Sequence, residues 1–308
     1  MEEGRSTIDP GLLYCSNCQG LLPPVGNFCP HCGSARPVSA SPFGPKTLGG
    51  IFEGTFQIYA AGFLGIVIIV ALVEIPLSLL GYWLESVIDS AVVELVDDFE
   101  SDILIDLPRL IEIFRSAFYL IGILIIATWL TSIVMGGALI HGVSGQILGE
   151  PIRVPRAYSF AVNRFGAMLG ASILVGLAVI LMAITIIGIP FAIYFGVRWL
   201  FVMQTASLER CGPVSALARS SNLVRGNWWR VFGTLLLVAI LLAIANAIAS
   251  AVLGLVPYVG PMVVAVLFGP VWMIAQTLLY HDLRVRRDGQ GHYNPAVLTS
   301  ELQSQSGL

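Results

Sequence analysis

Four long stretches of this chain contain almost no charged residues, and they constrain its fold more than any other feature. Residues 54–84 and 165–208 carry one charge each, and residues 116–149 and 231–280 carry none. A helix that crosses a membrane needs about 20 consecutive apolar residues. Each stretch is therefore long enough to hold at least one membrane span.

The third and fourth stretches are too long for a single span. They contain 44 and 50 residues, which at about 1.5 Å per residue exceed twice the roughly 30 Å thickness of the hydrocarbon layer. Glycine and proline at 188–190 and at 254–261 can reverse the chain. The sequence therefore predicts six spans, at about residues 60–83, 117–140, 166–187, 189–208, 231–253 and 259–281.

Composition agrees with lipid as the solvent for most of the chain. Charged residues make up 11% of the 308 residues, against about 25% in soluble domains, and the mean hydropathy is +0.84. We therefore expect an all-α integral membrane protein. Residues 1–50 contain no apolar stretch of signal-peptide length and begin with two acidic residues after Met1, so we expect a cytosolic N-terminus.

The basic residues indicate how the spans are oriented. With the N-terminus inside, residues 1–55, 149–165 and 208–230 and the C-terminal tail lie inside, and they hold 13 of the 16 basic residues. Basic residues accumulate in cytoplasmic loops. We therefore expect both termini to be cytosolic. Arg109 and Arg115 fall in the first outside segment, about residues 85–115.

This outside segment is also acidic, because it carries nine carboxylates between interspersed apolar residues. We expect one or two amphipathic helices that lie on the outer membrane surface or cap the bundle. A solvated acidic face is the simplest interpretation of the carboxylates, and weak binding of divalent cations is the alternative.

The N-terminal segment contains a paired CxxC motif, in which ten residues separate Cys15 and Cys18 from Cys29 and Cys32. Four thiolates at this spacing suit a tetrahedral Zn²⁺ ion, and two disulfides or free thiols are the alternatives. Metal binding would supply most of the folding energy of a segment with so few apolar residues. The second half of the motif resembles short bacterial and archaeal zinc ribbons. We predict a structural zinc ribbon at residues 1–36.

The rest of the chain divides into three parts. Residues 37–50, rich in proline, serine and glycine, are expected to be a flexible linker. Residues 51–287 form the predicted six-span membrane domain, and residues 288–308 form a cytosolic tail.

The membrane domain contains a weak internal repeat. A shift of 61 residues aligns Ala157 with Ala218 and Arg164 with Arg225. Each set precedes a hydrophobic hairpin, and residues 51–63 have a similar pattern. We therefore expect three hairpins, each introduced by an interfacial amphipathic helix on the cytosolic side.

Tryptophan and arginine are concentrated just before the fifth expected span. Indole and guanidinium groups are favoured at the level of the lipid headgroups. The predicted headgroup contacts are Arg225, Trp228, Trp229 and Arg230.

The same region resembles a known family. The similar motifs are IPF at 189–191, RWLF at 198–201, LERCGP at 208–213, ALARS at 216–220 and NLVRGNWWRVFG at 222–233. They resemble the membrane domain found beside some bacterial glycerophosphodiester phosphodiesterases, over about residues 47–287. In those enzymes a separate soluble barrel carries out catalysis, and this sequence does not contain it. The resemblance therefore implies a prokaryotic plasma membrane and no enzymatic activity.

Two full charges fall inside the expected spans, Glu74 and Arg198. Each alone would cost about 2.5–3.5 kcal/mol at the centre of a membrane, so we hypothesise that they form an ion pair. The alternative is that Arg198 extends to the interface or to backbone carbonyls, while Glu74 bonds to backbone groups freed by Pro76.

No catalytic triad, phosphate-binding loop or dinucleotide motif occurs in the sequence, so we expect a protein that is not an enzyme. The favoured function is a membrane scaffold or accessory protein whose zinc ribbon docks a cytosolic or membrane protein. The alternative is a transporter or channel for a small solute or lipid that uses Glu74 and Arg198. Nucleic-acid binding is not expected because the zinc segment lacks a basic patch. A homo-oligomer is compatible with the sequence.

Overall fold

The computed structural model describes Cys18, His31 and Cys32 and the residues 44–101, 107–256, 258–289 and 292–303, with the backbone alone at 94–101, 107–110 and 113. The chain divides into two units, Met1–Gly44 and Pro45–Leu308. Most of the predicted zinc ribbon and half of the predicted linker therefore lie outside the described residues, and the fold given below is that of the second unit.

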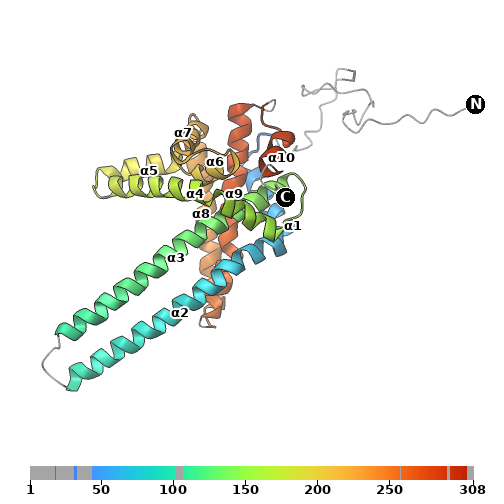
Figure 1. The fold of residues 1–308 in the computed structure, drawn as a ribbon. Helices are drawn as coiled ribbons and strands as arrows, with labels where there is room; N and C mark the ends of the chain where they lie inside the picture. Colours follow the sequence, from blue (N-terminus) through green and yellow to red (C-terminus); the bar gives the residue numbers. More distant parts are fainter. Residues whose placement is uncertain are drawn as a thin grey trace, which may run out of the picture. The chain divides into compact units, whose positions relative to one another are not determined.

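Every regular element described in the second unit is an α-helix (Figure 1). Thr47 caps the first helix, because its hydroxyl oxygen accepts a hydrogen bond from the Gly50 N–H at 3.1 Å. The helices are α1 (Leu48–Ala61), α2 (Phe63–Ser101), α3 (Leu107–Ile147), α4 (Val154–Ala183), α5 (Gly188–Arg198), α6 (Val202–Leu208), α7 (Pro213–Val224), α8 (Trp228–Leu253), α9 (Val259–Asp288) and α10 (Pro295–Gln303).

Six segments are long and apolar enough to cross a membrane. This confirms the predicted all-helical fold with six apolar spans. The six segments are Phe63–Val93, Phe114–Ile147, Val154–Ala183, Gly188–Leu208, Trp228–Leu253 and Val259–Asp288.

The long helices pack side by side. α3 lies beside both α2 and α4, α4 also contacts the short helix α5, and α8 lies beside α9 (Figure 1). α9 also contacts α1, α2 and α3, so its C-terminal half is surrounded by other helices. Ile274, Leu278, Leu279 and Leu283 are at most 1% exposed there. The core of the unit is therefore built around this half of α9.

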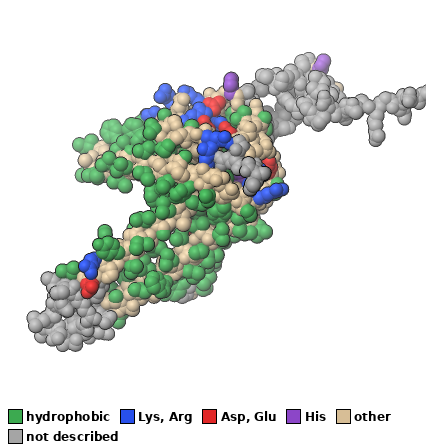
Figure 2. Space-filling model, viewed as in Figure 1, with side chains coloured by type: hydrophobic (Ala, Val, Ile, Leu, Met, Phe, Trp, Pro, Cys, Tyr) green, Lys and Arg blue, Asp and Glu red, His purple; other side chains and the backbone are tan. Residues whose placement is uncertain are grey.

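Away from this core the paired helices expose apolar side chains. Leu79 on α2, Ile125 on α3, Leu181 on α4 and Ile248 on α8 are each between 60% and 63% exposed. Figure 2 shows many hydrophobic side chains, interspersed with uncharged polar groups and backbone, on the visible face of the second unit. Apolar surface of this extent is typical of helices that contact lipid or another protein.

The acidic segment at about 85–115 differs from its prediction. Instead of separate surface helices, it continues α2 to Ser101 and begins α3 at Leu107. The reason is local, because residues 82–101 contain neither glycine nor proline to end the helix. The interfacial helix predicted near 157–164 is likewise the first part of α4, whereas α1 and α7 are separate short helices.

The fourth apolar segment is broken into α5 and α6, with no helix from Trp199 to Phe201. The backbone groups freed by the break are satisfied by polar side chains. Ser220 donates to the Arg198 carbonyl at 2.8 Å and accepts from the Phe201 N–H at 3.2 Å. Gln276 donates to the Leu200 carbonyl at 2.6 Å. Irregular backbone at membrane depth requires partners of this kind.

Candidate functional site

Charged side chains gather around the C-terminal end of α9, and we call this cluster the charged junction. Figure 2 shows blue and red side chains concentrated in this part of the second unit. Its members come from the start of the unit, from the ends of α6 and α8, and from α7, α9 and α10. They are Lys46, Glu209, Arg219, Arg230, Asp282, Arg284, Arg286, Asp288 and Glu301.

The carboxylate of Asp282 is the most buried group of the charged junction, with a side chain that is 0% exposed. One oxygen accepts the backbone N–H of Lys46 at 2.6 Å. The other accepts Arg286 at 2.9 Å and Arg230 at 3.2 Å. Both arginines also donate to the Lys46 carbonyl. Asp282 therefore ties the chain before α1 to α8 and α9.

A second part of the charged junction joins α6 and α7 to α9 through Arg219. Its Nε donates to Glu209 at 2.6 Å, and its two terminal nitrogens donate to both oxygens of Asp288 at 3.1 and 2.5 Å. Burial acts to lower the pKa of Arg219, but hydrogen bonds to Asp288 and the charge of Glu209 raise it overall. Tyr280 donates a further hydrogen bond to Glu209 at 2.8 Å.

A third part of the charged junction anchors α10. Arg284 donates to both oxygens of Glu301, at 2.8 and 2.5 Å, and its guanidinium lies 4.2 Å from the centre of the Tyr293 ring. Leu298 and Leu302 of α10 are also buried. Burial raises the pKa of Tyr293 above its ordinary value, so its hydroxyl stays protonated.

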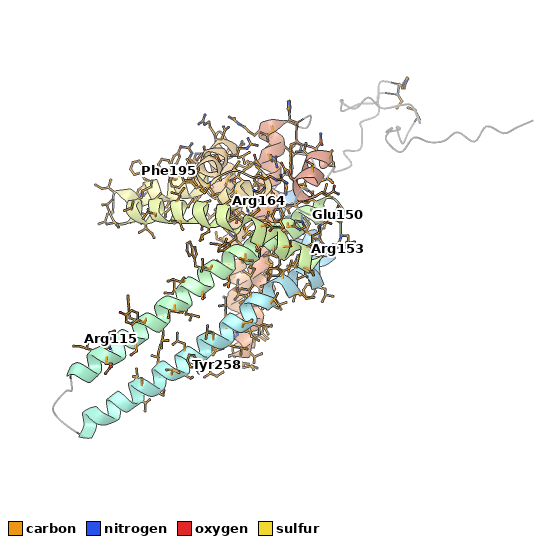
Figure 3. All side chains as sticks on the ribbon, in the orientation of Figure 1. Arg115, Glu150, Arg153, Arg164, Phe195 and Tyr258 are labelled. Carbon is orange, nitrogen blue, oxygen red and sulfur yellow. The ribbon has the colours of Figure 1, made fainter. Side chains whose placement is uncertain are left out.

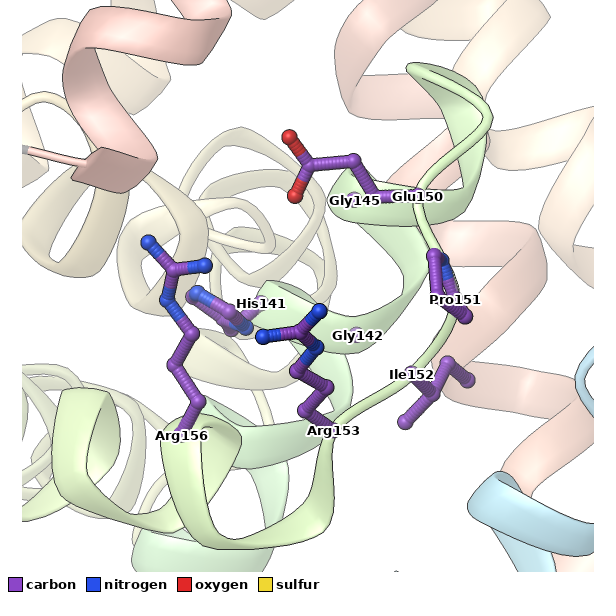
Figure 4. Close-up of a pocket in the computed structure, with 8 residues that line it drawn as sticks. All are labelled: His141, Gly142, Gly145, Glu150, Pro151, Ile152, Arg153 and Arg156. Carbon is purple, nitrogen blue, oxygen red and sulfur yellow. The ribbon is translucent and has the colours of Figure 1, made fainter.

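A pocket of about 270 Å³ lies where α3 ends and α4 begins, and we call it the basic pocket (Figure 4). One wall is the last part of α3, and the other is the connecting loop with the first turn of α4. Figure 3 shows Glu150 and Arg153 at this junction, at the opposite end of α3 from Arg115. The lining residues are His141, Gly142, Gly145, Glu150, Pro151, Ile152, Arg153 and Arg156.

Glycine residues position the loop that closes the basic pocket. Gly149 has φ +81°, a conformation that favours glycine, and the Glu150 N–H bonds back to the Gly145 carbonyl at 2.9 Å. Ile152 then packs against Gly65 of α2, where an added Cβ would come within 2.8 Å of the Ile152 side chain. The loop is therefore fixed against both α2 and α3.

The electrostatics of the basic pocket are those of an anion site. Figure 4 shows Arg153, Arg156 and His141 on one side and the carboxylate of Glu150 on the other. Within the described part of the chain, neither guanidinium has an ion-pair or hydrogen-bond partner. Arginine forks recognise carboxylates and phosphates by bidentate hydrogen bonding, so the pocket presents unused donors to a ligand.

Two of the four predicted zinc ligands, Cys15 and Cys29, lie outside the residues that the structure describes. Cys18 and Cys32 are exposed. No group of three or more potential ligands occurs among the residues that the structure describes. The four-cysteine zinc site therefore stays a prediction.

Glu74 and Arg198 both belong to the described residues, and they do not form an ion pair with each other. The guanidinium of Arg198 instead lies over the rings of Tyr194 and Phe195, at 5.7 and 5.8 Å from their centres. Such cation–π contacts partly replace the hydration that the charge loses. Glu74 lies half-buried on α2.

The four predicted headgroup contacts separate into two groups. Arg225 and Trp229 are exposed, as a headgroup contact requires. Trp228 stacks on Phe232 at 5.1 Å and donates to the Tyr194 carbonyl at 3.2 Å. Arg230 differs from its prediction, because it turns inward to Asp282. A fully buried carboxylate needs cationic partners, and this need orients Arg230.

The charged junction and the basic pocket were not identified from the sequence. The sequence feature that could have indicated the charged junction is a set of four acidic residues among the arginines of the predicted inside segments. They are Glu209, Asp282, Asp288 and Glu301.

No protein-family model, curated protein or solved structure matches the chain.

Proposed function

We propose that this chain is a non-enzymatic scaffold of a prokaryotic plasma membrane, with six spans in three hairpins and both termini in the cytosol. One observation carries the proposal, namely the separation of apolar surface from charge in the second unit. Large apolar side chains are exposed along α2, α3, α4, α5 and α8, while the charged junction gathers at the C-terminal end of α9.

This arrangement supports a scaffold for two reasons. The charged junction ties together the start of the unit, the ends of α6 and α8, and α7, α9 and α10, and so supplies a fixed base on one side. The helix pairs extend from this base with exposed apolar side chains, which suit contact with lipid and with other membrane proteins.

The predicted zinc ribbon would add a cytosolic docking module. Its support is the spacing of Cys15, Cys18, Cys29 and Cys32, which suits one structural Zn²⁺ ion. Purified protein is expected to contain one zinc ion per chain by elemental analysis. The variant with all four cysteines changed to serine is expected to contain none.

Photo-crosslinking in native membranes tests the scaffold. A benzophenone amino acid is placed at Leu79, Ile125 or Leu181, which are exposed, and as a matched control at Ile69, which is buried at 0% exposure. The scaffold predicts a discrete protein adduct from at least one exposed position and none from Ile69. Adducts with lipid alone at every exposed position would refute it.

A further inference from the structure

We propose that the basic pocket binds the phosphodiester of a membrane phospholipid headgroup. The inference rests on the proposed membrane location of the chain. The pocket lies between the ends of two apolar segments, Phe114–Ile147 and Val154–Ala183. If these segments span the membrane, the pocket lies at the level where lipid phosphates are found.

The hydrogen-bond donors of the pocket are unused and convergent. Arg153 and Arg156 each carry a fork of guanidinium N–H groups, and neither has a protein partner among the described residues. Both belong to the start of α4, whose first residue is Val154 and whose N-cap has no side-chain hydrogen bond. The positive end of the helix dipole therefore adds to the charge of the two side chains.

The charge count favours a diester over a free phosphate. The two arginines and Glu150 leave the pocket with one net positive charge when His141 is neutral. A phosphodiester carries one negative charge and would neutralise it. A free phosphate or phosphomonoester carries about −1.5 to −2 at neutral pH, so it would leave excess negative charge beside Glu150.

The size of the pocket also favours a lipid headgroup as the ligand. At about 270 Å³ it is slightly smaller than the usual range of ligand pockets, which begins at about 300 Å³. It therefore suits a headgroup alone, with the acyl chains outside it. The buried backbone of Gly142 and Gly145 forms one wall of the pocket without side chains.

Titration of the full-length chain in a nonionic detergent tests this site. The probes are dihexanoylphosphatidylglycerol, which is a phosphodiester lipid, and inorganic phosphate, with monohexanoylglycerol as a probe that lacks phosphate. Wild-type protein is expected to bind the diester most tightly. The double variant Arg153→Gln/Arg156→Gln is expected to bind it at least about tenfold more weakly, because charge-assisted hydrogen bonds are lost.

Two further variants make the test specific. Glu150→Gln removes the opposing carboxylate and is expected to strengthen binding of inorganic phosphate severalfold relative to the diester. Arg115→Gln, which removes an exposed arginine at the opposite end of α3 from the pocket, is the matched control and is expected to leave diester binding unchanged. Thermal unfolding of each variant in the same detergent verifies that it is folded.

Three results would overturn the inference. Diester affinity could be unchanged in the double variant, monohexanoylglycerol could compete with the diester, or inorganic phosphate could bind more tightly than the diester to wild type. The last result would assign the pocket to a soluble phosphate compound. These outcomes are separate from failure of the proposed function, because crosslinking and zinc content are measured on chains with an intact pocket.

Discussion

At the scale of single residues, Asp282 is the most constrained charge of the molecule. Its carboxylate is completely buried and accepts from Lys46, Arg230 and Arg286. A buried charge adds little net stability when all its partners are present, but removing one partner leaves the others buried and unpaired. The three donors belong to different segments, so their arrangement depends on this one side chain.

Asp282→Ala is therefore expected to destabilise the folded unit by about 3–5 kcal/mol, because Arg230 and Arg286 lose their counter-charge. Thermal unfolding in detergent measures the change. Asp89→Ala, at an exposed acidic residue of α2, is the matched control and is expected to unfold like wild type. Equal stability of the two variants would show that the buried carboxylate does not hold the charged junction together.

Cys211 lies beside the charged junction, and the pKa of its thiol is raised. Burial raises the pKa of its thiol, and the charge of Glu209 raises it further. A raised pKa reduces the thiolate fraction at neutral pH, and thiolate is the reactive form. In a chain whose other four cysteines are serine, alkylation of native protein is expected to reach half its maximal rate at a higher pH than alkylation of the same chain unfolded in SDS. An identical pH midpoint would contradict the shift.

At the scale of elements, α10 is anchored through two buried leucines and one ion pair. It is a nine-residue helix, shorter than helices that are stable alone in water, so its order depends on Leu298, Leu302 and the Arg284–Glu301 pair. Glu301 supplies both acceptors of that pair. The helix is therefore a sensitive reporter of the charged junction.

Glu301→Gln is expected to accelerate amide hydrogen exchange in residues 295–303 by about ten- to a hundredfold, since hydrogen bonds to charged groups are worth about 1.5–3 kcal/mol. Exchange followed by mass spectrometry measures this. Ser300→Ala, at an exposed position of the same helix, is the control and is expected to leave exchange unchanged. Unchanged exchange in Glu301→Gln would mean that contacts other than this ion pair retain α10.

The elements that could be predicted from the sequence are those set by long local patterns. Six apolar segments follow from uncharged stretches that exceed one or two bilayer thicknesses. The break between α5 and α6 could not be located in this way, because Ser220 and Gln276, which satisfy it, are distant in sequence.

The functional sites, like the break in the helix, depend on contacts that local sequence patterns do not show. The Glu74–Arg198 hypothesis considered only charges within apolar stretches, whereas Arg198 packs on the neighbouring Tyr194 and Phe195. The basic pocket depends on how the loop after Gly149 folds back against α2. In the sequence its arginines indicate only orientation, because nothing there shows that they lack partners among the described residues.

At the scale of the whole molecule, α2 is longer than the hydrocarbon layer of a membrane is thick. Its 39 residues extend about 58 Å as a helix, against a hydrocarbon layer of roughly 30 Å. If the span begins at Phe63, the residues near Glu85 lie beyond the outer boundary of the hydrocarbon. The paired helices α2 and α3 would then project from the outer membrane surface.

Glu85→Cys in a chain without other cysteines is therefore expected to react from outside with a membrane-impermeant maleimide on intact cells. Leu72→Cys, about 14 Å along the helix from Phe63, is the control inside the bilayer and is expected to stay unlabelled. Labelling is followed by the shift in mass on a gel. Protection of Glu85→Cys in intact cells, with labelling only after lysis, would place this end of α2 in the cytosol.

The break between α5 and α6 has a consequence for biogenesis. A ribosome makes the chain from its N-terminus, so the carbonyl of Leu200 leaves the exit tunnel 76 residues before Gln276, which binds it. Until that glutamine is synthesised, this carbonyl lacks the partner that it has in the folded chain, and lipid would offer no replacement. If this segment crosses the membrane, the Leu200 carbonyl therefore gains its partner only after α9 has been made, so the last long helix to be translated completes one that was translated much earlier.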